Sequence, residues 1–246
     1  MIVKSKIKIN GNYISYVYTH ENNSHLALLL HGFGSDMHEK GNFDTLSEKL
    51  LQSNVDSLRF DYLGHGNSDG HTEDLTMEIA INEALTLLKK YPHKKISIIG
   101  TSYGGGLAAL LTEHIDVDKL VLWSPLIDAK NNVIHPQNHF CKDFLGEEAL
   151  KQIREKGYAT FGNTNVKFNM NTFNDAEKYD AKKVLQNFKG KVKIFHGTLD
   201  LVVPYKQSLE LKSKNIDVKL IEKATHCFYD DSNKMLIEET VNFLKN

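Results

Sequence analysis

The sequence predicts an α/β fold in which a mostly parallel central sheet is flanked by helices. Short, continuous apolar runs recur along the chain, a pattern typical of strands that are buried on both faces. Longer segments with helical periodicity separate these runs, and such an alternation of strands and helices favours parallel pairing. The expected buried strands are residues 26–30, 57–60, 96–99, 120–123, 192–195 and 218–221, and the expected helices lie at about 43–51, 75–91, 102–112, 205–213 and 233–244.

The N-terminal segment alternates with a period of two residues and predicts a β-hairpin. Lys4, Lys6 and Lys8 share one parity, whereas apolar side chains occupy most of the other, so one face of this strand is charged. Charged side chains are common on edge strands, where they oppose pairing with another chain. Gly11 then favours a turn into residues 13–18, a second strand rich in aromatic and β-branched residues.

The alternation of strands and helices is interrupted once, over about sixty residues. Residues 125–187 contain no buried-strand run, are rich in asparagine and carry scattered aromatic side chains. Dividing the 246 residues by the roughly 150 of a typical domain gives between one and two domains. We therefore expect one core domain, made of residues 1–124 and 188–246, with residues 125–187 inserted as a cap over the C-terminal edge of the sheet.

Composition and charge argue against several classes of partner. The chain has 30 Lys and Arg against 31 Asp and Glu, a formal net charge of −1, and only Arg59 and Arg154 are arginine. Because arginine supplies the bidentate contacts to phosphate and guanine, we expect no nucleic-acid partner. The apolar run at 26–30 is far shorter than the ~20 residues that span a bilayer. Residues 1–9 alternate in polarity, so we expect neither a signal peptide nor membrane insertion.

The two cysteines indicate neither a disulfide framework nor a structural zinc site. Cys141 and Cys227 lie far apart, without the spacing of a CxxC or Cys/His motif, and a reduced, cytoplasmic protein is expected. His135, His139 and Cys141 lie close together within the insertion, but a fourth ligand is not evident, and we predict no metal site. The sequence leaves a homodimer open.

The segment from Gly100 to Gly104 carries the strongest chemical signal. Its pattern, Gly-Thr-Ser-Tyr-Gly, places Ser102 at a tight turn between an expected strand and an expected helix. The two glycines leave room for the close approach of neighbouring backbone. Gly-x-Ser-x-Gly also occurs by chance, in about 8% of chains of this length on average composition, so the surrounding strand and helix are needed as context. In this context, the pattern predicts that Ser102 is a nucleophile.

A serine nucleophile needs a base, which a third group holds in place. The last two expected strands run into loops that carry Asp200 and His226, at the sheet edge where ligands bind in open α/β sheets. The order Ser102, Asp200, His226 is the one associated with this type of turn. Taken alone, Asp200 could cap the helix that follows, and His226 could be a surface or core histidine. The tight turn at Ser102, together with the order and spacing of the three residues, favours the catalytic interpretation.

The oxyanion formed during acyl transfer requires hydrogen-bond donors. The loop His31-Gly32-Phe33-Gly34-Ser35 follows the first buried strand and can direct the Phe33 N–H at the reaction centre. The second expected donor is the Tyr103 N–H, at the helix N-terminus, whose positive dipole end also favours negative charge. Without the serine turn, an ordinary strand-ending turn would be the simpler interpretation of His31 and Gly32.

Together these motifs resemble those of the α/β-hydrolase superfamily. The resemblance covers nearly the whole chain outside 125–188 and rests on residues 31–34, the D-x-x-G-x-G-x-S loop at 60–70, the turn at 100–104, the acid-bearing loop at 196–200 and the histidine loop at 224–228. Within the superfamily the pattern is most similar to bacterial cinnamoyl (feruloyl) esterases, which carry a cap inserted at the same point. That group commonly has His-Ser-Gln at the turn, whereas Thr101-Ser102-Tyr103 stands here, so the acyl pocket of this chain is expected to differ.

The resemblance implies the α/β-hydrolase fold and a serine carboxylesterase that acts on a small-molecule ester through an acyl-enzyme, with no metal or organic cofactor. Short-chain or hydroxycinnamoyl esters are the expected substrates. A monoacylglycerol lipase or lysophospholipase, a hydrolase-like ligand receptor and an acyltransferase remain alternatives. A simpler interpretation of the cap aromatics is that they form the core of the cap itself. The candidate substrate-binding residues are His31, Phe140, Tyr158, Phe168 and Phe173, with Phe144, Phe161 and Tyr179 as further aromatic candidates.

Overall fold

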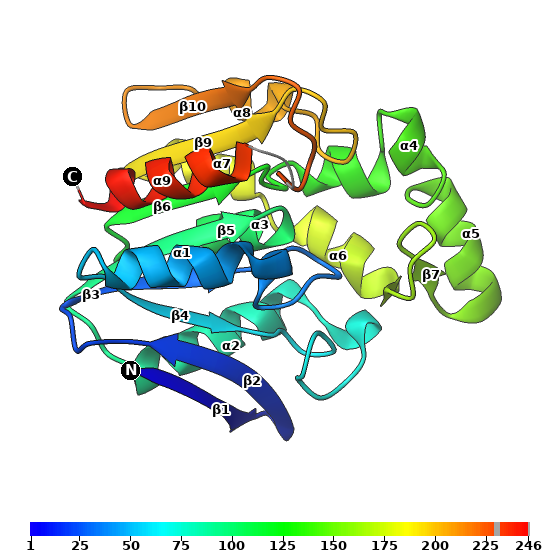
Figure 1. Ribbon diagram of the computed structural model, residues 1–246. Helices are drawn as coiled ribbons and strands as arrows, with labels where there is room; N and C mark the ends of the chain where they lie inside the picture. Colours follow the sequence, from blue (N-terminus) through cyan, green and yellow to red (C-terminus); the bar gives the residue numbers. More distant parts are fainter. Residues whose placement is uncertain (229–231, 246) are drawn as a thin grey trace.

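The computed structural model describes residues 1–228 and 232–245. Within these residues, eight strands form one sheet in the order β1-β2-β4-β3-β5-β6-β9-β10 (Figure 1). The β1–β2 and β2–β4 pairs are antiparallel, and the other pairs are parallel. The mostly parallel α/β sheet expected from the alternation is therefore confirmed. The strands are β1 (Ile2–Ile9), β2 (Asn12–Thr19), β3 (His25–Leu30), β4 (Asp56–Phe60), β5 (Lys95–Thr101), β6 (Lys119–Trp123), β9 (Lys191–Gly197) and β10 (Ile216–Ile221).

Helices cover both faces of the sheet. Helices α1 and α9 lie on one face, and α2, α3 and α7 lie on the other (Figure 1). These helices and the short turns beside them are η1 (Glu39–Gly41), α1 (Asn42–Leu51), η2 (Thr72–Asp74), α2 (Met77–Lys90), α3 (Tyr103–Leu111), α7 (Ala181–Asn187), α8 (Lys206–Leu209) and α9 (Ser232–Lys245). Among the described residues, no helix is both long and apolar enough to cross a bilayer.

The expected helix at 205–213 is shorter than predicted. The α-helical part, α8, ends at Leu209, and the following N–H groups make tighter bonds, from Leu211 to the Ser208 carbonyl and from Lys212 to the Leu209 carbonyl. Ser213 then donates to the Ile216 carbonyl, which turns the chain into β10. The predicted helix was too long because the periodicity of the sequence does not show where tighter turns replace the last α-helical turn.

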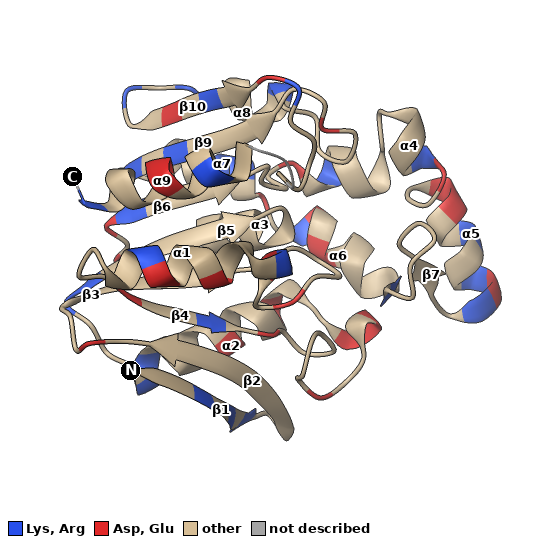
Figure 2. Ribbon diagram, in the orientation of Figure 1, with Lys and Arg blue, Asp and Glu red and all other residues tan. Residues whose placement is uncertain are grey.

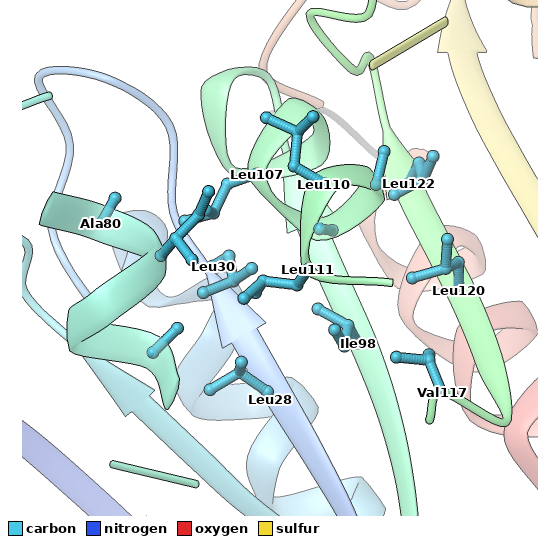
Figure 3. Close-up of a cluster of buried hydrophobic side chains, with 14 of the residues drawn as sticks. Leu28, Leu30, Ala80, Ile98, Leu107, Leu110, Leu111, Val117, Leu120 and Leu122 are labelled. Carbon is cyan, nitrogen blue, oxygen red and sulfur yellow. The ribbon is translucent and has the colours of Figure 1, made fainter. Parts of the chain in front are cut away.

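Successive side chains of the central strands point to opposite faces and so build two cores. In β3, Leu26, Leu28 and Leu30 join the core under α2 and α3, whereas Ala27 and Leu29 join the core under α1 and α9. Figure 3 shows the first of these cores, where leucines of α3 meet side chains of β3, β5 and β6. Complete burial of one leucine stabilises the fold by roughly 1.5–3 kcal/mol, so this continuous burial fixes the central strands rigidly.

The N-terminal hairpin forms the edge of the sheet. The side chains of Lys4, Lys6 and Lys8 on β1 are exposed, and Figure 2 shows these basic positions along the strand. β2 pairs with β4 on its other side, so β1 is the outer strand. The edge strand predicted from the alternation of charge is therefore confirmed.

Most of the segment between β6 and β9 lies beyond the C-terminal ends of the strands (Figure 1). Its first part has a small core of its own, to which Val133, Phe144, Phe168 and Phe173 contribute. Helix α7, at the end of the segment, instead packs Ala181 and Leu185 into the larger core of the sheet. The elements before α7 are η3 (Lys130–Ile134), α4 (His139–Lys142), α5 (Glu147–Lys156), β7 (Ala159–Thr160), β8 (Lys167–Phe168) and α6 (Met170–Lys178).

Candidate active site

Ser102 lies at a strained turn between β5 and α3. Its φ of +50° and ψ of −116° are unusual for a residue with a side chain, and such strain persists where the surrounding structure fixes it. The surroundings here are tightly packed backbone. A Cβ on Gly100 would lie 2.2 Å from the Gly104 carbonyl oxygen, and a Cβ on Gly104 would lie 2.1 Å from that of Leu30. Both glycines are therefore required by close contact.

The structure brings the three predicted catalytic side chains together. His226 Nε2 lies 2.9 Å from Ser102 Oγ, and His226 Nδ1 lies 2.7 Å from Asp200 Oδ2. An ionised carboxylate can only accept hydrogen bonds, so the Nδ1–H of His226 donates to Asp200. Nε2 then accepts a hydrogen bond from the Ser102 hydroxyl. The three loops meet because each follows the C-terminal end of a parallel strand, namely β5, β9 and the neighbouring β10.

Asp200 accepts hydrogen bonds from several directions. Its Oδ1 atom accepts from the N–H groups of Val202 and Val203, both at 2.8 Å, so it also organises its own loop as a helix-capping residue would. Its Oδ2 atom lies 3.1 Å from Nε2 of the buried His196, in addition to His226. Burial by itself would raise the pKa of Asp200, but the hydrogen bonds from the two histidines hold it well below its usual range. The carboxylate is therefore ionised at neutral pH.

The contact with His196 was not predicted from the sequence. His196 is completely buried on β9, and its Nδ1 atom bonds the hydroxyl of Ser208. The signal was present in the acid-bearing loop, because His196 lies four residues before Asp200. A histidine at the end of a buried strand gives no direction for its ring, however, and the tertiary structure had to supply it.

The two expected oxyanion donors remain available. Within the described part of the chain, neither the Phe33 nor the Tyr103 backbone N–H has a hydrogen-bond acceptor. The loop that carries Phe33 is held on both sides, because Gly34 N–H donates to His65 Nε2 at 3.1 Å and Gly32 N–H donates to the Glu39 carboxylate, also at 3.1 Å. A preorganised N–H of this kind is what oxyanion stabilisation requires.

His31 supports this loop and does not line the cavity beside it. Tyr62 N–H donates to its Nε2 atom, and its Nδ1–H donates to the Gly32 carbonyl oxygen at 2.8 Å. Burial lowers the pKa of His31 to about 3, so the ring is neutral. The structure therefore places the ring of His31, for which a substrate-binding role was predicted, in the buried interior, where its two hydrogen bonds support the oxyanion loop.

A cavity of about 430 Å³ lies over Ser102 and His226. The core contributes wall residues such as Leu75 and Met77, and the segment between β6 and β9 contributes Phe161 and Val166. Charged groups are also present in the wall, and they include the carboxylates of Glu39 and Asp175. Sequence reasoning missed these aliphatic and acidic residues, because they come from four separate segments that share no motif.

The predicted cap aromatics divide between the cavity wall and other places. Phe168 lines the cavity, and so do Phe161 and Tyr179. Phe173 is buried in the small core of the cap, as the simpler interpretation expects. Phe140 is 49% exposed on α4, and Tyr158 lies under the Lys167 ammonium, 4.2 Å from its ring centroid. Neither of the last two lies in the described cavity wall.

The structure also places Tyr103 and the two cysteines relative to the cavity. The Tyr103 ring lines the cavity between Phe33 and Tyr62, and its buried hydroxyl has no hydrogen-bond partner among the described residues. Cys227 lines the cavity and is only half-buried, whereas the side chain of Cys141 is directed at the Val202 carbonyl. Across residues 1–228 and 232–245, no group of three or more His, Cys, Asp or Glu side chains is arranged to hold a metal ion.

The fold and the site define a serine hydrolase of the α/β-hydrolase class. Residues 21–167 match the family model Hydrolase_4, described as serine aminopeptidase, S33. The match spans more than half of the chain, and the chain belongs to this family.

Comparison with individual proteins gives more distant similarities. The chain is 25% identical over 201 residues to mitochondrial palmitoyl-protein thioesterase ABHD10 of Bos taurus, which covers 76% of this chain and 62% of that protein. It is 25% identical over 128 residues to monoglyceride lipase of Rattus norvegicus, covering 49% and 42% of the two chains. The match thus spans less than two thirds of these relatives. Est1E of Butyrivibrio proteoclasticus, solved with bound ferulic acid, superposes with a TM-score of 0.79 at 23% identity over 97% of each chain, which shows a shared fold.

Proposed function

We propose that the protein hydrolyses carboxylic esters through an acyl-enzyme on Ser102. The observation that carries this proposal is the continuous hydrogen-bonded chain from Ser102 Oγ through His226 to Asp200, at the floor of a cavity. Ser102 Oγ attacks the ester carbonyl carbon while His226 Nε2 takes its proton, and the resulting oxyanion accepts from the Phe33 and Tyr103 N–H groups.

Collapse of this tetrahedral intermediate breaks the bond to the alcohol. His226 returns its proton to the leaving oxygen, and the acyl group stays on Ser102. Water then attacks the acyl carbon, gives its proton to His226 and releases the acid, after which Ser102 regains its proton. Asp200 keeps the Nδ1 side of the imidazole oriented and stabilises its positive charge in both steps.

We further propose a compact acyl group of the short-chain or hydroxycinnamoyl type. The cavity volume of about 430 Å³ lies toward the low end of the range of roughly 300–1,000 Å³ typical of small-molecule sites. Aromatic walls from Phe161 and Phe168 suit a planar acyl group, and Asp175 adds one polar acceptor. The structural likeness to Est1E, which was solved with bound ferulic acid, supports the same choice. The inserted segment before α7 would then act as the cap that selects the acyl group, because α7 itself packs into the core of the sheet.

A lipid esterase is the second candidate. Aliphatic residues such as Leu75, Met77 and Val166 line the cavity, and the chain matches part of a monoglyceride lipase and of a palmitoyl-protein thioesterase. A thioester presents the same carbonyl to Ser102, so the same residues would serve either reaction. Acyl-chain length separates the two candidates, because a long chain must fill or leave the cavity.

The test compares kcat/KM on acetyl, butyryl, decanoyl and feruloyl esters and on a long-chain monoacylglycerol under one condition. We expect the highest values on the butyryl or feruloyl ester, and their loss in Ser102→Ala but not in the exposed control Ser5→Ala. The highest value on the monoacylglycerol would establish the lipid esterase instead. Tight ligand binding with negligible turnover would overturn hydrolysis in favour of a receptor, and ester products formed with an added alcohol would indicate acyl transfer.

A further inference from the structure

Glu39 is a buried acid beside the nucleophile that the mechanism above does not use. It lies in η1, is 7% exposed, and lines the cavity with Ser102 and His226. Glutamate is rarely buried without a cation that pairs with it, so its place here calls for a physical reason.

The carboxylate of Glu39 is tied to the oxyanion loop. Its Oε2 atom accepts the Gly32 N–H at 3.1 Å, and the Ser35 side chain forms a second hydrogen bond to it. Gly32 is the residue before Phe33 and lies against the nucleophile, since a Cβ on Gly32 would be 3.4 Å from Ser102 Cβ. Glu39 therefore holds, through a hydrogen bond, the backbone directly next to the expected oxyanion donor.

The backbone at Glu39, which makes this contact, is strained. Its φ is +45°, and Lys40 follows with φ of +54°, both in the left-handed region that residues with a Cβ avoid. Strain of this kind costs energy and persists only where the surrounding structure enforces it, often at functional sites.

The surroundings of Glu39 act on its pKa in opposite directions. Burial raises the pKa of Glu39, and this effect outweighs the bonds from Gly32 and Ser35 and the proximity of His226, which favour the charged form. Asp36 on the same loop and Tyr62 after β4 also face it, and Asp36 works against its ionisation. A carboxylate in this place thus reduces the stability of the fold at neutral pH, where an uncharged glutamine would not.

On the basis of the ester hydrolysis proposed above, we propose that Glu39 is a positioning residue for the oxyanion site, whose ionised carboxylate holds the Gly32 N–H and thereby fixes the direction of the Phe33 N–H. A carboxylate oxygen is a stronger acceptor for the Gly32 N–H than a neutral oxygen would be. The same negative charge stabilises the positive charge that His226 gains in the transition state.

The test is Glu39→Gln, with Glu113→Gln, an exposed carboxylate beyond α3, as the matched control. We expect Glu39→Gln to lower kcat by about 10- to 100-fold, less than the 10²–10³-fold typical for loss of a whole donor, with little change in KM. Thermal stability should be equal or higher, because a buried charge is removed. The acid limb of the kcat/KM profile should also lose one ionisation. Glu113→Gln should behave like the wild type in all of these measurements.

Ser35→Ala provides a second test that does not touch the buried acid. It removes a bond that favours the ionised form of Glu39, so the pKa of Glu39 rises and the acid limb of kcat/KM moves to higher pH. If Glu39→Gln does not fold, the Ser35→Ala profile decides. Suppose that the wild type has Ser102-dependent activity. Unchanged kinetics in Glu39→Gln, or an unmoved pH profile in Ser35→Ala, would then overturn the role of Glu39 and leave the proposed function standing. Absence of Ser102-dependent activity in the wild type would overturn the proposed function.

Discussion

Nε2 of His196 lies 3.1 Å from Oδ2 of Asp200, so a second, fully buried histidine holds the acid that orients His226. The same Nε2 atom lies 3.0 Å from the Val203 carbonyl oxygen, and Nδ1 bonds the Ser208 hydroxyl. Because a carboxylate and a carbonyl oxygen can only accept, the ring is protonated at Nε2. His196 thus fixes the acid loop from behind, as His226 engages it from the front of the site.

Replacement of His196 by Leu should therefore weaken both fold and activity. The change leaves buried acceptors without a donor, and we expect a loss of about 1–3 kcal/mol in the free energy of unfolding. The pKa of Asp200 should rise, because a hydrogen bond that holds it low is lost. A depressed carboxylate pKa contributes stability above the unfolded pKa, and this stability is lost as the pH falls through the folded pKa. Acid unfolding of the variant should accordingly begin at higher pH.

Urea unfolding at pH 7 and at pH 4, followed by circular dichroism, measures the effect of His196→Leu. His196→Asn is the matched variant, because its amide can still donate toward Asp200. Partial recovery of kcat in His196→Asn would support a positioning role. Identical stability and kcat in His196→Leu and the wild type would contradict it.

Asp200→Asn should abolish most turnover without preventing substrate binding. Asparagine presents an N–H or a carbonyl to His226 Nδ1, and the histidine loses the partner that sets its tautomer. Loss of this partner lowers kcat by about 10⁴-fold in serine hydrolases, with the geometry retained. Steady-state kinetics on a p-nitrophenyl ester gives kcat and KM separately. A decrease in kcat below tenfold would show that Asp200 does not orient the base.

Glu83 should make the stability of the fold decrease as the pH rises. It is 2% exposed on α2, and burial raises its pKa to about 8. Between the unfolded pKa near 4.5 and the folded value near 8, the native state holds a proton that the unfolded chain releases. The free energy of unfolding therefore falls with increasing pH across this window, by about 1.4 kcal/mol per pH unit from this group.

Glu83→Gln removes this term while it keeps an acceptor for the Leu63 N–H. Urea unfolding at pH 5.5 and 7.5 should show a larger stability decrease in the wild type than in the variant. The variant should be the more stable protein at pH 7.5. Equal pH dependence of the two proteins would mean that Glu83 ionises normally in the folded state.

Gly104→Ala should prevent the serine turn from forming. Alanine normally favours a helix over glycine by about 1 kcal/mol, so the helical position alone predicts stabilisation. The Cβ would instead meet the Leu30 carbonyl oxygen at 2.1 Å, and backbone atoms cannot move aside as a flexible side chain can. We expect a loss of about 3 kcal/mol or more.

Gly157→Ala is the control for this comparison, because nothing lies within 4 Å of its Cβ although its φ is +82°. Its cost should be limited to the left-handed conformation, about 1–2 kcal/mol. Thermal unfolding and the yield of folded protein measure both variants. A Gly104→Ala protein as stable as Gly157→Ala would show that the turn can relax.

Local residue patterns were sufficient to predict the layers of the fold and the sheet edge that carries the chemistry. Continuous apolar runs such as 26–30 define strands covered on both faces, and this pattern depends only on local residue types. The order Ser102, Asp200, His226 after successive strands implied a common sheet edge, because parallel strands end at the same side. The length of the helix after Pro204 was overestimated, since tighter turns carry no separate periodicity.

The side chains that surround this chemistry could not be predicted in the same way, because they come together through long-range packing. His196, Glu39 and Asp175 reach the site or its cavity from β9, η1 and α6, and no local pattern relates those segments to one another. For the same reason the aromatic residues of the cap lie in different environments, with Phe168 in the cavity wall and Phe140 half-exposed. Periodicity specifies how a segment folds against a core, whereas the direction of a single side chain depends on long-range packing that the segment does not encode.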